Sequence, residues 1–167
     1  MPNWCANHLV VRGDEKEITR FRKQAESGKV KDSDTMHDIE FTISPFLPMP
    51  KDLEGTRSPS LRPVKRLIKK YGTDNWYDWR VKNWGTKWDV EGYLEDESPR
   101  KLGYTFDSAW GPPDEAIKAM SKMYPTLTFT LKYDEPGMDF SGTLKLRNGE
   151  VLMNDQVESK IAKQLND

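Results

Sequence analysis

The sequence predicts an α+β fold in which an antiparallel sheet carries helices on one face, with a ferredoxin-like core and a helical insertion. Strand-like and helix-like stretches alternate along most of the chain. Three short alternating stretches then follow one another near the C-terminus, so they must pair antiparallel. The length of 167 residues fits a single domain spanning 1–167.

The N-terminal part predicts a strand, a helix and a second strand. Residues 7–13 are rich in β-branched residues, and residues 39–43 alternate as a half-buried strand does. Between them, residues 14–28 predict an amphipathic helix. Asp14 is its expected N-cap, and Gly28 is its expected end.

An insertion at about 44–85 is expected to interrupt this core. Residues 44–60 contain four prolines, which predict an extended loop because proline donates no backbone hydrogen bond. Residues 61–72 predict a helix, and residues 74–85 predict a second short helix capped by Asp74. The apolar stripe of the first helix comprises Val64, Leu67, Ile68 and Tyr71.

The C-terminal half predicts further strands around one helix. The expected strands are 87–94, 102–110, 127–134, 139–146 and 150–153, and the expected helices are 111–125 and 155–165. Asn148 and Gly149 form the strongest short hairpin signal in the chain.

Composition excludes little about function. Charged residues make up 32% of the chain, but the net charge is only −1, so a charged partner would need a local patch. The single Cys5 excludes an intramolecular disulfide and favours a reducing compartment. No signal-like or membrane-spanning apolar run is seen, so a soluble cytoplasmic protein is expected.

Tryptophan is concentrated in one segment. The chain has 6 tryptophans, and four of them lie between residues 76 and 88. One interpretation is a packed structural motif in which Gly85 supplies a positive φ; its members are Asn83, Trp84, Gly85, Trp88 and Asp89. The other interpretation is an exposed stacking or protein-anchoring surface formed by Trp76, Tyr77 and Trp79.

A basic helical face is the leading candidate for binding. It comprises Arg62, Lys65, Arg66, Lys69 and Lys70, which lie opposite the apolar stripe. Such a face contacts phosphates, and the aromatic residues just beyond it suit single-stranded nucleic acid. An acidic protein partner would use the same face, and a merely solvated helix would show the same pattern.

Residues that carry covalent or metal chemistry are few. Pro2 would become a free secondary amine after methionine removal and could act as a general base, with Arg12 nearby for an oxyanion. Cys5, His8 and His37 fall short of the four ligands of a structural zinc site. No phosphate-binding loop or nucleophile motif is found, so neither a cofactor nor a metal is expected.

Four stretches are similar to a known family: "MPNWCANHLVVRG", "FLPMP", "VKNWGTKWDV" and "TFDSAWGPP". In this combination and order the chain resembles the Api92-like proteins of bacteriophages and conjugative plasmids. The resemblance implies a ferredoxin-like domain and a bacterial mobile element as the source, and it implies no catalytic residues. We therefore expect a non-enzymatic binding protein. The occurrence of the family in phages and plasmids suggests an accessory or counter-defence role.

Overall fold

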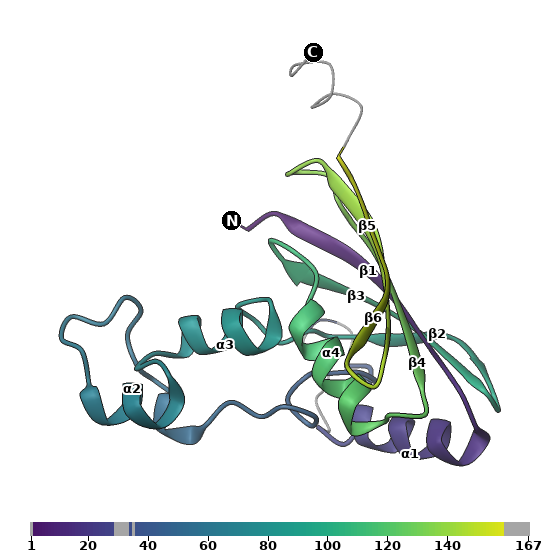
Figure 1. The fold of residues 1–167 in the computed structure, drawn as a ribbon, viewed down its shortest axis with the longest axis horizontal. Helices are drawn as coiled ribbons and strands as arrows, with labels where there is room; N and C mark the ends of the chain where they lie inside the picture. The colour runs from purple at the N-terminus through teal and green to yellow at the C-terminus, as the bar shows by residue number, and fades with distance from the viewer. Residues whose placement is uncertain (1, 29–33, 35, 159–167) are drawn as a thin grey trace.

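The computed structural model describes residues 2–28, 34 and 36–158, and its centre is a six-stranded antiparallel sheet (Figure 1). The strands are β1 (Trp4–Arg12), β2 (Tyr93–Ser98), β3 (Lys101–Ala109), β4 (Thr128–Glu135), β5 (Phe140–Arg147) and β6 (Glu150–Glu158). The helices are α1 (Glu15–Ala25), α2 (Lys65–Tyr71), α3 (Trp76–Trp84) and α4 (Asp114–Met123), with a short 3-10 helix η1 (Lys51–Leu53).

The strand order is that of a ferredoxin-like core with an added hairpin. The sheet runs β2-β3-β1-β4-β5-β6, so β1, α1, β2, β3, α4 and β4 form two interleaved β-α-β units. Strands β5 and β6 extend the sheet beyond β4. They meet at Asn148 and Gly149, which have φ values of 49° and 76°, as the hairpin signal predicts.

The hydrophobic core lies on one face of the sheet, beneath α1 and α4. In β1 the buried positions alternate along the strand, so Leu9 and Val11 point into the core. Phe21 of α1 packs against Tyr104 of β3 and Phe129 of β4, with ring centroids 6.3 and 5.5 Å away. Ile117 and Met120 of α4 are fully buried in the same cluster. The predicted fold class, with helices on one face, is confirmed.

The chain between α1 and β2 forms the insertion, whose residues 44–85 we call the arm. Figure 1 shows α2 and α3 projecting to one side of the sheet, with α3 nearer to α4. None of the helices in the described part of the chain is long and apolar enough to cross a membrane.

The arm is attached to the core where α3 ends. The fully buried Trp84 donates its indole N–H to the Leu47 carbonyl oxygen at 2.9 Å. Gly85 follows with φ 84° and lies so close to α4 that a Cβ there would overlap Asp114 Oδ1. Thr86 then donates its hydroxyl to the Ala109 carbonyl oxygen at the end of β3, at 3.0 Å.

Two predicted strands and one predicted helix are wrong in extent or type. Residues 39–43 bury their apolar side chains but form only an isolated bridge between Phe41 and Gly92. The strand expected at 87–94 begins only at Tyr93. Residues 155–158 belong to β6 rather than to a helix, because β5 supplies backbone partners along its whole length; residues 159–165 lie outside the described chain.

The two helices of the arm are shorter than predicted. Helix α2 begins at Lys65 rather than at residue 61, and α3 begins at Trp76. Asp74 does not cap α3, because its carboxylate accepts hydrogen bonds from Val64 N–H and from the Ser60 hydroxyl, which lower its pKa. Asn75 takes the N-cap position and accepts a hydrogen bond from Asp78 N–H at 2.9 Å.

Gly85→Ala should destabilise the protein by about 1–3 kcal/mol, because alanine meets both the positive φ and the overlap with Asp114. Urea unfolding measures the change. Gly55→Ala (φ 71°, open surroundings) isolates the backbone strain, and Gly111→Ala (no atoms within 4 Å) is the neutral control. Equal stabilities for Gly85→Ala and Gly111→Ala would contradict the close contact.

Candidate binding surfaces

The predicted basic residues are all exposed, but they do not share one helix. Arg62 lies before α2, while Lys65, Arg66, Lys69 and Lys70 lie within it. We call these five residues the basic surface. Apart from Lys70, none of them makes an ion pair with another described residue.

Lys70 is partly neutralised by an acid from outside its helix. Its ammonium lies 3.8 Å from Asp52 Oδ2 of η1, and Asp52 also accepts a hydrogen bond from the Tyr71 hydroxyl at 2.8 Å. The hydrogen bond and charge of Tyr71, together with the charge of Asp52, raise the pKa of Lys70. One of the five predicted basic residues is therefore paired with an acid, whereas the other four pair with no acid of the described chain.

The arm is strongly polarised against the rest of the molecule. Residues 57–82 contain eight basic and two acidic residues, a net charge of +6. Since the whole chain carries −1, the remaining residues carry −7. A neutral total thus conceals a local excess of positive charge, which is the property that attracts polyanions.

The apolar stripe predicted for α2 is buried at only one position. Leu67 is buried, whereas Val64 and Ile68 are exposed together with Leu61, which has 76% of its surface accessible. The rest of the stripe is not fully buried because α2 lies at the end of the arm (Figure 1), where little of the core reaches it. These three apolar side chains stand beside the basic surface.

The predicted aromatic platform is reduced to two residues. Trp79 is only 7% exposed and packs edge-on against Trp84, with centroids 5.8 Å apart, so it cannot stack on a ligand. Tyr77 is exposed and Trp76 is half-buried, with their rings 5.8 Å apart. The Arg80 guanidinium lies 5.3 Å from the Trp76 ring centroid and 5.0 Å from that of Trp84.

The motif at 83–89 is structural in four of its five residues. Trp84 is buried, and Gly85 has the positive φ that was predicted. Asn83 does not serve the turn, since its amide donates to the Trp79 carbonyl oxygen at 2.8 Å. Asp89 reaches another segment and accepts hydrogen bonds from Ile43 N–H, Ser44 N–H and the Ser44 hydroxyl. Only Trp88 departs from this role, because 38% of it is exposed.

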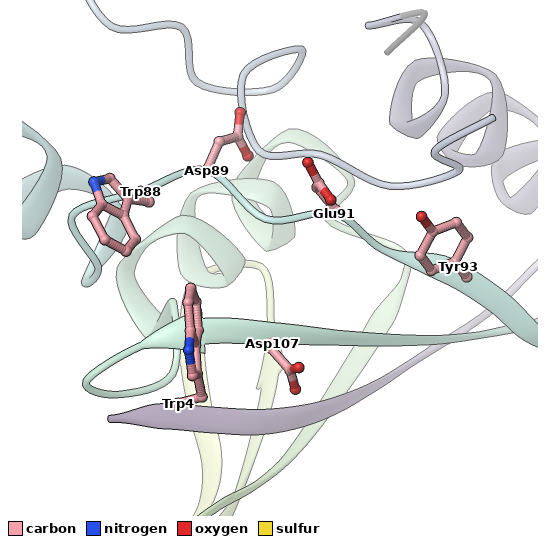
Figure 2. Close-up of a pocket in the computed structure, with 6 residues that line it drawn as sticks. All are labelled: Trp4, Trp88, Asp89, Glu91, Tyr93 and Asp107. Carbon is pink, nitrogen blue, oxygen red and sulfur yellow. The ribbon is translucent and has the colours of Figure 1, made fainter. Parts of the chain in front are cut away.

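Trp88 lines a cleft that sequence analysis did not predict. The cleft has a volume of about 480 Å³ and is lined by Trp4, Trp88, Asp89, Glu91, Tyr93 and Asp107 (Figure 2). The Trp4 and Trp88 ring centroids lie 5.9 Å apart at an interplanar angle of 40°. The period-two alternation of β1 places Trp4 on the face opposite Cys5, which is the one sequence signal that could have indicated an exposed indole.

The residues predicted to carry covalent or metal chemistry lie far apart in the fold. Pro2 precedes β1 and Arg12 ends it, and the nine residues Trp4–Arg12 span about 26 Å. Arg12 therefore cannot assist the Pro2 amine. Cys5 faces the core, whereas His8 lies on the other face of β1 and approaches Glu95 at 3.5 Å. Within the described residues, no three His, Cys, Asp or Glu side chains are grouped to hold a metal ion.

The topology and the projecting arm define a ferredoxin-like α+β protein that carries a helical insertion. A family model described as the ferredoxin-like domain in Api92-like protein matches residues 83–167. The match covers slightly more than half of the chain, which therefore belongs to the Api92-like family. It includes β2 through the C-terminus, and the basic surface lies outside it.

A solved structure supports the same fold. The crystal structure of the Api92 protein from Yersinia pseudotuberculosis superposes with a TM-score of 0.59 at 12% sequence identity, covering 95% of this chain and 99% of that one. At this identity the likeness concerns the fold alone. None of the curated proteins compared with the chain matches its sequence.

The buried thiol of Cys5 should make the free energy of unfolding fall at high pH. Its burial raises the thiol pKa from 9.0 to about 12 in the folded protein, against a weaker opposing hydrogen bond with Ser108. Between these values the folded state retains a proton that the unfolded state has released, so the free energy of unfolding falls by about 1.4 kcal/mol per pH unit. Below pH 9.0 the contribution is fully present.

The comparison with Cys5→Ala isolates this effect, because both proteins share every other titrating group. Urea unfolding under reducing conditions should give a steeper loss of stability for the wild type from pH 9.0 towards about 12. Parallel curves for the two proteins would show that the thiol is not held protonated by the core.

Proposed function

We propose that the protein is a non-enzymatic nucleic-acid-binding protein that uses the basic surface of its arm. The observation that carries the proposal is the +6 charge of residues 57–82 in a chain whose total charge is −1. Arg62, Lys65, Arg66 and Lys69 are exposed without ion-pair partners among the described residues, so phosphates can replace their counterions directly.

The aromatic residues next to α2 favour single strands over duplexes. Tyr77 is exposed in the first turn of α3, and Trp76 stacks edge-on against it. Both rings belong to α3, which follows α2 within the same arm, so they are the proposed stacking partners for bases of a strand bound along α2. Stacking of this kind contributes about 1–3 kcal/mol per base and is tolerant of sequence.

The proposed setting is the cytoplasm of a bacterium that carries a phage or conjugative plasmid. The support for this source is the resemblance of the chain to the Api92-like family. Binding to nucleic acid would be an accessory activity in that setting, and no residue of the described chain is assigned to catalysis.

A second candidate is a protein-interaction module that acts on a host complex. Leu61, Val64 and Ile68 favour it, because an exposed apolar strip beside cations suits an acidic amphipathic partner. Such a complex would combine apolar burial with charge, so it would resist salt better than a complex with nucleic acid.

The test is a fluorescence-anisotropy titration with single- and double-stranded DNA and RNA oligonucleotides at low and high salt. We expect tighter binding of single strands and a steep loss of affinity with salt. The variant Lys65→Glu, Arg66→Glu, Lys69→Glu should lower the salt slope of log K by about 2–3, since three phosphate contacts are removed.

The matched control is Lys16→Glu, Lys23→Glu, Lys132→Glu, which changes the net charge equally at exposed sites on α1 and β4. It should retain the wild-type salt slope. Absence of binding at low salt, or equal losses in both triple variants, would reject the basic surface as the nucleic-acid site. Salt-resistant capture of an acidic host protein that Ile68→Glu abolishes would favour the second candidate instead.

A further inference from the structure

The cleft between Trp4 and Trp88 has the composition of a cation site rather than a phosphate site. Two of its walls are indole rings, of which Trp4 is 49% and Trp88 38% exposed. Its other polar lining is Tyr93 and three carboxylates, and no basic side chain of the described residues is part of that lining. Its volume of about 480 Å³ lies within the range of small-ligand pockets.

Two of the carboxylates are available to a ligand. Asp89 is occupied, because its oxygens accept hydrogen bonds from Ile43 N–H at 2.7 Å and from the Ser44 hydroxyl at 2.5 Å. Glu91 and Asp107 are exposed and make no hydrogen bond or ion pair with another described residue. Figure 2 shows them on opposite sides of the cleft, Glu91 on the segment above and Asp107 on β3 below.

The chain already places one of its own cations on this aromatic wall. The Lys87 ammonium lies 4.3 Å from the Trp88 ring centroid, the distance of a cation–π contact. The same ring is thus in an environment that attracts positive charge. Trp4 has no such intramolecular cation among the described residues, so its exposed face is free for a ligand.

We propose that this cleft binds an organic cation, a guanidinium or an alkylammonium group. The cation lies against the indole of Trp4 and is neutralised by Glu91 and Asp107. The acids of the cleft, all of them described residues, are not grouped to hold a metal ion, whereas an organic cation needs only the indole face and carboxylates along the same cleft. The cation belongs either to a free small molecule or to an arginine or lysine side chain of a partner protein.

This site is separate from the proposed nucleic-acid surface. None of its lining residues belongs to the basic surface, and its negative charge repels phosphate. The two proposals therefore fail independently: the triple variant of the basic surface should retain cation binding, and variants of the cleft should retain nucleic-acid binding.

The test follows the indole N–H signals of the tryptophans by NMR while the protein is titrated with agmatine, tetramethylammonium and an arginine-rich peptide. We expect saturable shifts at Trp4 and Trp88. Trp4→Ala should weaken binding roughly 2- to 30-fold by removing a cation–π contact. Asp107→Asn and Glu91→Gln should each weaken it roughly two- to fivefold.

The matched controls are Trp110→Ala, which removes an indole exposed to 47% outside the cleft, and Glu115→Gln, which removes an exposed charge on α4. Both should bind as the wild type does. Saturation by the small cations assigns the site to a free ligand, and saturation by the peptide alone assigns it to a protein side chain. No saturation with any cation at millimolar concentration, or equal binding of a glutamate-rich peptide, would overturn the proposal.

Discussion

The contact between the end of α3 and the ferredoxin-like core is the constraint on which the arm and both candidate surfaces depend. Trp84 fills the core and Gly85 lets the backbone approach α4. Four residues after Gly85, Asp89 accepts hydrogen bonds from the backbone of Ile43 and Ser44. The Asp89 carboxylate is half-buried and both of its oxygens accept hydrogen bonds, so this clamp joins two segments distant in sequence.

This contact positions both candidate surfaces. On one side it holds the arm, whose α2 carries the basic surface away from the negatively charged body. On the other side it brings Trp88 to within 5.9 Å of Trp4, at the start of β1, which creates the aromatic cleft. Two surfaces of opposite charge are thus built around one attachment point, and each attracts ligands of the opposite sign.

The sequence predicted elements that are stabilised locally. Asp14 accepts a hydrogen bond from Lys16 N–H at 3.2 Å as an N-cap should, and the Asn148-Gly149 turn joins β5 to β6. Predictions from the sequence are wrong where contacts between distant residues determine the structure. Residues 39–43 form no extended strand, because the Asp89 carboxylate accepts the hydrogen bond of Ile43 N–H. Asp74 does not cap α3, because its carboxylate accepts a hydrogen bond from Val64 N–H.

The charge of the basic surface could be predicted from the sequence, but the cleft between Trp4 and Trp88 could not. The cations of α2 can be recognised from the sequence because they lie close together in it, whereas Asp52, which pairs with Lys70, lies outside the helix. Of the two interpretations of the tryptophan cluster, the buried Trp84 and Trp79 favour the packed one, whereas Trp88 is exposed. The cleft escaped prediction because Trp4, Trp88 and Asp107 come from three separate segments, and their meeting depends on the register of β1 with β3.

Amide hydrogen exchange of Asp89→Ala measures directly whether the hydrogen bonds of Asp89 to Ile43 and Ser44 hold the arm on the core. If the clamp attaches the arm, α3 and residues 43–47 should exchange faster in the variant while β1, β3 and β4 keep their protection. Asp107→Ala is the control, because it removes a nearby carboxylate that holds no backbone group. Unchanged exchange in the arm, or loss of protection throughout the sheet, would contradict the claim that the Asp89 clamp helps to hold the arm on the core.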